Sequence, residues 1–336
     1  MKRRDFLKAL GLSGIGLAFR HPYHARLVFA GDTLLGGYYN GIYGTQTRLL
    51  EELEGLERPE EIFGDLLKSF GNADLACINL EGPVTPDFPK SYIESRMIRK
   101  SFPLRQTEKT GGILKRAGIG IVTLANNHIY DFDGETGLRY TLELLDLPYL
   151  GVGKGEDAYQ GLELDLNGIR IYLSGLTDIL DPEWMVAERG KLGVAGIPEK
   201  SGYGKSRRLQ CFRKNLEEAR ADFKIVFMHW GPPFGPEVNS RQTEISRLLF
   251  ESGADIVIGC HSHCKQPEYF WRSGGKVRKL LVYGMGNLVF GGKRGRQALS
   301  CLAEIDLYKD RDCWIEYRIR DFIPNRDGDF KPVLMA

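Results

Sequence analysis

Two histidines, His261 and His263, stand two residues apart directly after an apolar run that spans 253–259. In an extended chain residues i and i+2 point the same way, so both imidazoles are expected to converge on one point just past the end of a strand. Neutral imidazole is the commonest protein ligand of borderline transition metals. The pair therefore predicts a metal site, although an isolated pair of this kind fits polar loop residues equally well.

Further polar side chains follow apolar runs elsewhere in the chain, in positions like that of the histidine pair. They are Asp32, Glu81, Asn127, His128 and His229. Taken singly, Asp32 is typical of a turn, Glu81 of a solvated strand end and Asn127 of a helix cap. Four of the six histidines hold such positions, however, while His21 and His24 lie near the N-terminus. This coincidence favours one shared site.

The apolar runs predict the strands that position these side chains. They are rich in β-branched residues and lack clean polar alternation, as expected of strands covered on both faces. They span 27–30, 75–78, 119–125, 169–173, 224–228, 253–259 and 280–283. Helical patterns lie between several of them, at 62–70, 108–117, 135–147, 209–221 and 242–252, with Gly118 and Gly253 at the C-terminal cap positions. The alternation predicts right-handed crossovers, a largely parallel sheet and a functional site at the carboxyl ends of its strands.

Composition places the chain among ordinary globular proteins. Its 336 residues, of which 42% are hydrophobic and 27% charged, suffice for one large α/β domain or two modest ones. The formal charge of +2 gives no reason to expect nucleic acid or an anionic membrane as the partner. No repeat of solenoid or propeller period is evident, and nothing after residue 25 is long and apolar enough to span a bilayer.

The N-terminus differs from the rest of the chain. It is basic over residues 1–8 and weakly apolar over 9–19, and it resembles a twin-arginine export signal at Arg3, Arg4, Phe6, Leu7 and Lys8. No clean Ala-x-Ala cleavage site follows, so an uncleaved anchor is also compatible; the alternative is an ordinary basic amphipathic start. We therefore expect a signal or anchor segment at 1–24, a domain at 25–323 and a tail at 324–336.

The cysteines predict neither a disulfide framework nor a zinc cluster. Six of them are scattered through a chain that is too long to need such a framework. Cys260 and Cys264 bracket the histidine pair, but five consecutive residues can hardly supply four ligands to one ion. Neither thiol is therefore expected to bind metal.

The C-terminal part of the domain predicts a hairpin. Segments 300–307 and 314–319 alternate in polarity and flank a polar turn at 309–312. This pattern is typical of two antiparallel strands with one solvated face. We expect the hairpin to cap an edge of the sheet.

Taken together, the motifs resemble the bacterial capsule synthesis protein CapA family, which includes poly-gamma-glutamate biosynthesis proteins. The matching motifs run in order from about residue 27 to about residue 291, and they are Gly31-Asp32, Asn79-Leu80-Glu81, Ala125-Asn126-Asn127-His128, His229-Trp230-Gly231, Gly259-Cys260-His261-Ser262-His263 and Tyr283-Gly284-Met285-Gly286-Asn287. The resemblance implies an α/β fold of the calcineurin-like metallophosphatase type. Such a fold is a sandwich of two mixed β-sheets flanked by helices, here with a C-terminal antiparallel hairpin.

The resemblance also implies roles for the candidate residues. One metal would be held by Asp32 and His263, and a second by Asn127, His229 and His261, with Glu81 in the bridging position. His128 would hydrogen-bond or protonate the leaving group, and Asp131 would orient it. Substrate-binding roles fall to Asn79, Asn126 and Asn287. The ligand types suit one or two divalent ions of Mn, Fe, Zn or Ni rather than Ca.

The sequence departs from the metallophosphatase pattern at three points. Leu34 stands where a histidine is usual, a glutamate replaces the bridging aspartate, and the acidic residue expected soon after His229 is replaced by a Pro-Pro-Phe segment before Glu237. Cations that follow two of the strands fit either phosphate binding or solvated loops. They are Arg96, Arg99 and Lys100, and Lys293, Arg294 and Arg296.

Three functional hypotheses follow. In the first, the chain is exported by the twin-arginine route and is a metal-dependent hydrolase of a phosphoester, or of an amide or ester in a cell-surface polymer. In the second, it is a non-catalytic binding or assembly component for an anionic polymer such as poly-gamma-glutamate, with other capsule synthesis components at the membrane as partners. In the third, it is a cytoplasmic phosphoesterase whose N-terminus mimics an export signal. Fold alone does not decide among them.

Overall fold

The protein is built around a sheet of 14 strands in a computed structural model that describes residues 22–38, 58–197, 206–290, 299–324 and 332–335. Its hydrogen-bonded order is β6-β5-β3-β1-β16-β17-β14-β12-β11-β9-β8, with β13 beside β14, β15 beside β1 and β18 beside β17. The strands of the central path are β1 (Tyr23–Thr33), β3 (Leu75–Leu80), β5 (Ile121–Thr123), β6 (Tyr149–Leu150), β8 (Leu162–Leu166), β9 (Ile169–Thr177), β11 (Phe223–His229), β12 (Ile256–Cys260), β14 (Lys276–Val282), β16 (Ser300–Lys309) and β17 (Cys313–Ile323). The lateral ones are β13 (Glu268–Ser273), β15 (Asn287–Val289) and β18 (Val333–Leu334).

The large sheet is folded so that its two halves face each other. One half runs from β6 to β17 and the other from β14 to β8, and they are joined by a single register pair, Val277 with Ile315. Buried side chains from both halves form one cluster, in which the rings of Phe29 and Phe227 lie 5.9 Å apart, edge to face. The predicted sandwich of mixed sheets is therefore confirmed, with the difference that the two sheets are continuous at one edge.

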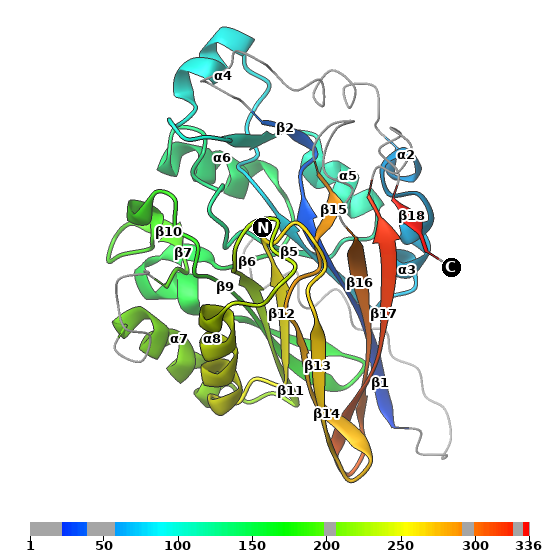
Figure 1. Ribbon diagram of the computed structural model, residues 1–336. Helices are drawn as coiled ribbons and strands as arrows, with labels where there is room; N and C mark the ends of the chain where they lie inside the picture. Colours follow the sequence, from blue (N-terminus) through cyan, green and yellow to red (C-terminus); the bar gives the residue numbers. More distant parts are fainter. Residues whose placement is uncertain (1–21, 39–57, 198–205, 291–298, 325–331, 336) are drawn as a thin grey trace.

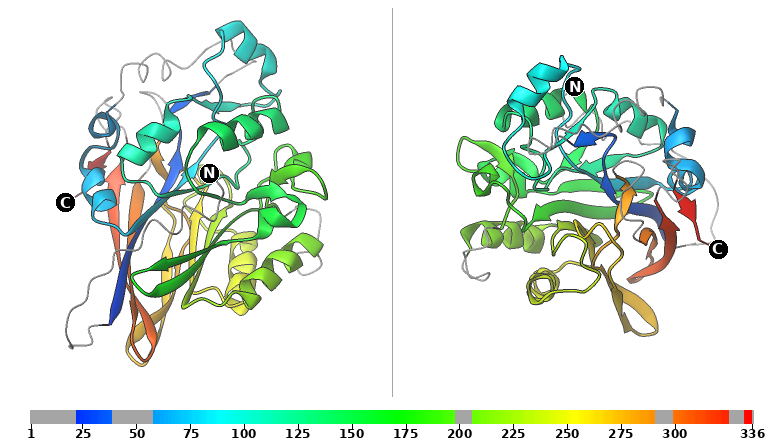
Figure 2. Two further views of the ribbon diagram at one scale, coloured as in Figure 1. Left: turned by 180° about the vertical axis from the view of Figure 1, so that it is seen from behind. Right: turned by 45° about the horizontal axis from the view of Figure 1, so that its top comes forward.

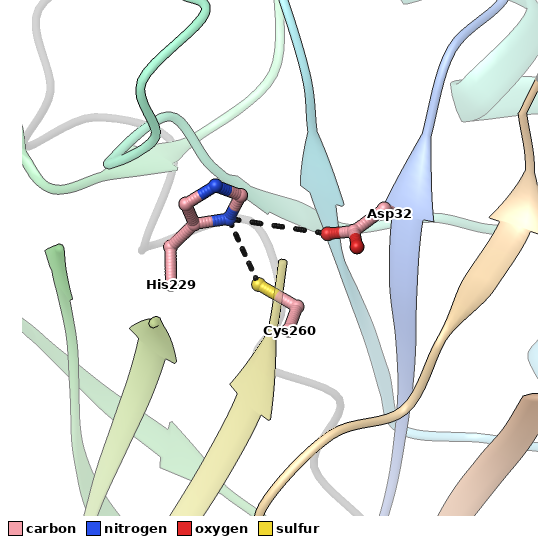
Figure 3. A group of neighbouring side chains, drawn as sticks. All are labelled: Asp32, His229 and Cys260. Carbon is pink, nitrogen blue, oxygen red and sulfur yellow. Dashed lines mark hydrogen bonds and ion pairs between the residues drawn. The ribbon is translucent and has the colours of Figure 1, made fainter. Parts of the chain in front are cut away.

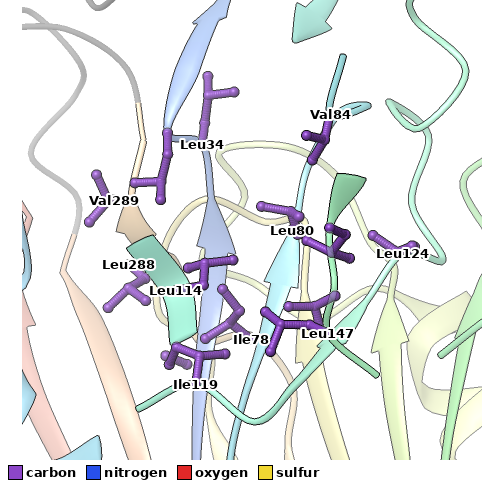
Figure 4. Packing of buried hydrophobic residues seen from close by; sticks show 14 of the residues in the cluster. Leu34, Ile78, Leu80, Val84, Leu114, Ile119, Leu124, Leu147, Leu288 and Val289 are labelled. Atoms are coloured by element: carbon purple, nitrogen blue, oxygen red, sulfur yellow. The ribbon is translucent and has the colours of Figure 1, made fainter. Parts of the chain in front are cut away.

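Helices cover the two outer faces of the sandwich, as Figures 1 and 2 show. The half that contains β1, β3 and β5 packs against α2 (Pro59–Phe63), α3 (Leu67–Gly71), α5 (Thr110–Arg116) and α6 (Glu135–Leu144), and part of that cluster is drawn in Figure 4. The other half packs against α7 (Arg207–Glu218) and α8 (Ser240–Glu251). Strands β3, β11 and β12 are thus covered on both faces, which explains why their apolar runs lacked polar alternation.

The helices agree with the sequence prediction except at two places. The segment predicted as one helix at 62–70 is broken into α2, a 3-10 turn η2 (Gly64–Leu66) and α3, because Gly64 has φ 52°, outside the helical region. A short helix α4 (Lys90–Arg96) was not predicted, since it is only two turns long and follows Pro89. Gly118 and Gly253 end their helices with φ of 86° and 95°, as expected of C-terminal caps.

The C-terminal hairpin is confirmed, but its predicted place at an edge is wrong. β16 and β17 pair antiparallel along ten residue pairs, and β16 also pairs along β1 from Phe29 back to Tyr23. β17 meets β14 on its other side. The hairpin therefore lies in the middle of the sheet, where it closes the gap between the halves. This position accounts for the complete burial of residues 300–303, which polar alternation alone did not suggest.

Strands lie near both ends of the predicted domain. β1 begins at Tyr23, inside the segment predicted as 1–24, and the twin-arginine motif lies outside the described residues, as do Lys293, Arg294 and Arg296. Part of the predicted tail forms β18, which pairs with β17. In the described part of the chain, no helix has the length and apolar character needed to cross a membrane.

Candidate functional site

The candidate residues come from strand ends in both halves of the sandwich. Asp32 lies near the carboxyl end of β1, with Asn79 of β3 and Asn287 of β15 as its register partners. Glu81 directly follows β3, whereas His229 is the last residue of β11. Because β1 and β3 are parallel, as are β11 and β12, and the halves face each other, these ends meet at one edge of the sandwich.

The histidine pair reaches the site by a turn rather than by an extended strand. β12 ends at Cys260, and His261 and His263 have positive φ of 88° and 51°, values that non-glycine residues rarely adopt. Their ring centroids lie 5.8 Å apart, and the rings of His229 and His261 lie 4.5 Å apart. Such backbone costs about 1–3 kcal/mol per residue and persists where the surroundings impose it, as at many functional sites. The two imidazoles thus lie close together, as predicted, but the predicted extended backbone is wrong.

Three groups of side chains place their ligand atoms within 4.8 Å of one another. These groups are Asp32 with Glu81 and His263, Glu81 with His229 and His261, and Asp32 with His229 and Cys260. Within them, His263 Nδ1 lies 3.4 Å from Asp32 Oδ2, and His229 Nε2 lies 3.5 Å from Glu81 Oε1. Glu81 belongs to two of the groups, so one carboxylate stands between two sets of imidazoles.

Two buried polar atoms in this cluster have no hydrogen-bond partner among the residues that the structure describes. They are Glu81 Oε2 and His261 Nδ1. Burial, and then the neighbouring Asp32 charge, raises the pKa of Glu81 well above its usual range. Burial and the nearby imidazoles lower the pKa of His229 and of His261. An unsatisfied buried carboxylate beside neutral imidazoles is costly, and a divalent cation would satisfy both atoms, so the donor set fits a metal.

Cys260 lies in the cluster, although the sequence analysis gave it no role. Its Sγ lies 3.3 Å from His229 Nδ1, and Asp32 Oδ1 lies 3.9 Å from the same nitrogen (Figure 3). One segment cannot supply four ligands through Cys260, Cys264 and the histidines between them, whereas the cluster draws on several segments and includes Cys260. The sequence did contain one indication that Cys260 belongs to the site, because it ends its apolar run as His229 does. All six cysteines of the chain are free in the described structure.

The three asparagines predicted to bind substrate all contact other residues of the site. Asn79 donates through Nδ2 to Asp32 Oδ1 at 2.8 Å and to Glu81 Oε1 at 3.3 Å. Asn126 donates to Asn79 Oδ1 at 3.2 Å and to the Leu80 carbonyl, and its own oxygen accepts from the His128 backbone N–H. Each of these contacts lies below the surface, so both side chains are engaged within the protein.

Asn287 and Asn127 each contact one of the imidazoles directly. Asn287 Oδ1 lies 2.8 Å from His263 Nδ1, and Asn127 Oδ1 lies 2.8 Å from His229 Nε2. An amide oxygen accepts, so these contacts assign the proton to His263 Nδ1 and to His229 Nε2 in the metal-free protein. Asn127 therefore reaches the cluster, as does Asn287 at its rim.

His128 and Asp131 form a hydrogen-bonded pair next to the cluster. His128 Nδ1 lies 2.7 Å from Asp131 Oδ2, which also accepts from the Leu104 N–H at 2.7 Å. Lys100 Nζ lies 2.7 Å from Asp131 Oδ1 and donates to the Asn127 carbonyl at 2.8 Å. Burial and then the Lys100 charge lower the pKa of His128, while burial raises the pKa of Asp131 to about 7. The sequence alone predicts only a phosphate-binding or solvated cation at Lys100, whereas its side chain is 7% exposed and paired with Asp131.

The remaining sequence candidates lie away from the cluster or outside the described residues. Leu34 is fully buried in the apolar cluster on the helical side. Glu237 is exposed, and its carbonyl accepts from Gln266. Arg96 forms an ion pair with Asp133 at 3.7 Å.

The sequence matches one protein family and two of its characterised relatives over most of the chain. Residues 26–292 match the family described as bacterial capsule synthesis protein PGA_cap. The capsule biosynthesis protein CapA of Bacillus anthracis is 26% identical over 325 residues, which cover 92% of this chain and 70% of that protein. The PGA biosynthesis protein CapA of Bacillus subtilis is 26% identical over 84% of this chain and 67% of that protein.

Superposition on solved structures gives partial likenesses. The NAD nucleotidase of Haemophilus influenzae covers 93% of this chain and 60% of its own, with 12% identity and a TM-score of 0.48. A hypothetical protein from Thermus thermophilus covers 88% of this chain and 99% of its own, with 14% identity and a TM-score of 0.47. The sequence match over most of the chain does identify the family, and this protein belongs to the bacterial capsule synthesis proteins of the PGA_cap family.

Proposed function

We propose that this chain is a metal-dependent hydrolase of capsule or poly-gamma-glutamate biosynthesis, which cleaves a phosphoester or an amide or ester bond of a cell-surface polymer. The observation that supports this most is the pair of buried atoms without partners, Glu81 Oε2 and His261 Nδ1, inside one cluster of ionisable side chains. Such groups are expensive to bury unless a ligand satisfies them.

The two groups that share Glu81 would hold the metal. Asp32, Glu81 and His263 form the first position, and Glu81, His229 and His261 form the second, with Asn127 beside His229. A divalent ion of Mn, Fe, Zn or Ni bound there supplies Lewis acidity, which makes water nucleophilic near neutral pH and polarises a scissile bond. Around it, Asn79 and Asn287 fix the orientation of Asp32 and His263 through their hydrogen bonds.

His128 is the residue proposed to handle a proton. Asp131 accepts from its Nδ1–H, so the lone pair of the neutral ring lies on Nε2. His128 retains 12% exposure of its side chain, in contrast to the fully buried His229. A partly open imidazole with a fixed tautomer can accept a proton at Nε2 and return it to the leaving group. Asp131 acts through His128 and is a positioning residue.

One observation favours the second hypothesis, a binding or assembly component without catalysis. Leu34 occupies the position of a usual metal ligand, and it is completely buried in an apolar cluster rather than turned toward Asp32. The first metal position thus has one donor fewer than the family of metallophosphatases offers. Under this hypothesis the cluster binds metal or an anionic polymer but does not turn over substrate.

The test is elemental analysis of the purified chain after incubation with Mn, Zn or Fe and gel filtration. The same samples are assayed with a phosphomonoester, a phosphodiester and a γ-glutamyl amide. We expect one or two bound equivalents and turnover of one substrate class, both lost in His261→Ala and retained in His24→Ala, whose ring lies at the opposite end of β1 and contacts Asp306. Binding without turnover would favour the assembly hypothesis. Absence of bound metal in the unaltered chain would overturn the proposal.

Export by the twin-arginine route, to the periplasm or to a membrane-anchored position outside the cytoplasm, is part of the same proposal. It is supported by Arg3, Arg4 and the apolar segment that follows them. Replacement of both arginines by lysine should retain the precursor in the cytoplasm, as measured by cell fractionation. Unchanged export of that variant would contradict the route.

A further inference from the structure

β13 is an edge strand whose exposed side chains are aromatic. It pairs with β14 alone in the described part of the chain, and five of its six residues are exposed. Among them, Tyr269, Phe270 and Trp271 retain 52%, 45% and 47% exposure. A row of unpaired backbone groups with large apolar side chains is a template for pairing with another strand, and monomeric proteins usually avoid it.

The side chains of β13 alternate between the two faces of the sheet. Tyr269 and Trp271 lie toward α8, with ring centroids 5.9 Å from Tyr283 and 5.1 Å from Phe250. On this face they line a groove of about 970 Å³ beside the helix. Phe270 points to the other face, where its ring lies 5.7 Å from Tyr317. An added strand would therefore find aromatic surface on both faces of the sheet.

The charges of β13 are arranged with opposite signs at its two ends. Glu268 and Arg272 flank the three aromatic residues. Glu268 shares the face of Phe270 by alternation, and Arg272 shares it although the pairing with β14 shifts register between Trp271 and Arg272. Arg272 lies over the Phe270 ring at 5.1 Å and donates to the Gly275 carbonyl. Within the described residues, neither Glu268 nor Arg272 forms a salt bridge. Neither charge is therefore neutralised by an opposite charge in the described structure, and each can pair across the edge.

This pattern is complementary to itself. If two copies of β13 pair antiparallel about Phe270, Glu268 of each copy faces Arg272 of the other, and Tyr269 faces Trp271. Directly opposed side chains in antiparallel strands interact when they are aromatic or oppositely charged. A two-fold interface requires that one patch complement its own copy, which is the property of this strand.

We propose that the chain forms a two-fold dimer in which β13 of each copy pairs antiparallel with β13 of the other, centred on Phe270. The sheet then continues from one subunit into the next, with two Glu268–Arg272 pairs on one face. On the other face the aromatic pairs lie between the two copies of α8. The proposal concerns a surface outside the metal-ligand cluster and does not depend on the proposed function.

Charge reversal tests the pairing directly. Sedimentation equilibrium of the full chain should give a dimer, and Arg272→Glu or Glu268→Arg should each raise its dissociation constant at least about tenfold, because both contacts then become like-charge pairs. The double variant Glu268→Arg with Arg272→Glu restores opposite charges and should restore the dimer. Arg207→Glu is the matched control, since that side chain is 92% exposed on α7, far from β13 in sequence.

The register is tested by oxidation of single cysteine variants. Phe270→Cys places the two new thiols opposite each other and should give a disulfide-linked dimer, whereas Tyr269→Cys faces Trp271 and should not link to itself. A thermal melt verifies that each variant is folded. The proposal is overturned if the unaltered chain is still monomeric at a protein concentration on the order of 100 μM. It is also overturned if the dimer persists unchanged in both charge-reversal variants.

Discussion

The ammonium group of Lys100 lies 2.7 Å from the carboxylate of Asp131, with 7% of the lysine side chain and none of the aspartate exposed. The same ammonium donates to the Asn127 carbonyl at 2.8 Å. Lys100 thus connects the segment after α4 with the loop that carries Asn127, His128 and Asp131. An ion pair of this kind contributes little net stability when both charges are present, but it leaves a costly buried charge when one is removed.

Replacement of Lys100 by Met should therefore lower the free energy of unfolding by about 3–5 kcal/mol, measured by urea titration. The double variant Lys100→Met with Asp131→Asn leaves no buried charge and should recover most of that loss. Lys115→Met is the control, because Lys115 pairs with Asp146 at the surface and should cost no more than about 1 kcal/mol. Equal losses in the two lysine variants would contradict the burial argument.

Asn79 is expected to set the affinity of the cluster for metal without binding the metal itself. Its Nδ2 donates to carboxylates on both sides, Asp32 and Glu81. Replacement by Ala frees both carboxylates to rotate, and loss of such outer contacts weakens metal binding by about 10- to 100-fold. Isothermal titration with Zn or Mn measures this change.

The control for that experiment is Asn215→Ala. Asn215 lies on α7 and donates a hydrogen bond to the Tyr159 carbonyl, away from the cluster in sequence. Its metal affinity should equal that of the unaltered chain. If Asn79→Ala binds as tightly as this control, the hydrogen bonds of Asn79 have no influence on the cluster.

Cys260 is predicted to be a thiol that packs beside His229 and does not bind the metal. Its Sγ lies 3.3 Å from the Met228 carbonyl, to which the S–H donates, and burial raises the pKa of the thiol well above its usual range. Cys260→Ala should therefore retain the metal content of the unaltered chain. The cobalt-loaded protein should lack thiolate-to-cobalt absorption in the near ultraviolet. A strong band that disappears in Cys260→Ala would instead make this residue a ligand.

The sequence was sufficient to predict the strands that carry the site and the edge of the sheet at which it lies, but not shorter strands such as β8, β13 and β15. Runs ending at Asp32, Glu81 and His229 were evident because strands buried on both faces are continuous in apolar residues. The place of β16 and β17 was not predictable, since local alternation records which faces are solvated but not which strand lies alongside. The order of the strands depends on pairings between residues that are far apart in the sequence, such as Tyr23 with Lys309, and local patterns carry no information about them.

The partners of individual side chains were harder to predict than the strands. Lys100 belongs to a loop whose sequence is typical of solvated charge, and only the fold buries it against Asp131. The family motifs predict substrate binding for the asparagines, but they do not predict that Asn126 donates to Asn79. Such contacts join different strands, so no periodicity within one segment reveals them.

Titration of the buried cluster should make the stability of the metal-free chain depend on pH. His229 and His261 have pKa values lowered by burial, so below pH of about 6.5 the unfolded chain binds protons that the folded chain does not. These groups reduce stability as the pH falls. Asp131 has the opposite effect, because its pKa is raised to about 7 and the folded chain binds its proton first as the pH falls. Glu81, whose pKa is also raised, acts in the same direction as Asp131.

Single replacements separate these opposing effects, since each removes one titrating group. The metal is first removed with a chelator. Urea titrations at several values between about pH 7 and about pH 5, a range that includes the ordinary imidazole pKa, then give the slope of the unfolding free energy with pH. His261→Gln should make the loss of stability on acidification smaller by about 1.4 kcal/mol per pH unit below about pH 6.5. Asp131→Asn should make the loss larger over the same range, because it removes a group that favours the folded state in acid. If both variants changed the slope in the same direction, the assignment of neutral imidazoles and a protonated carboxyl to the folded state would be wrong.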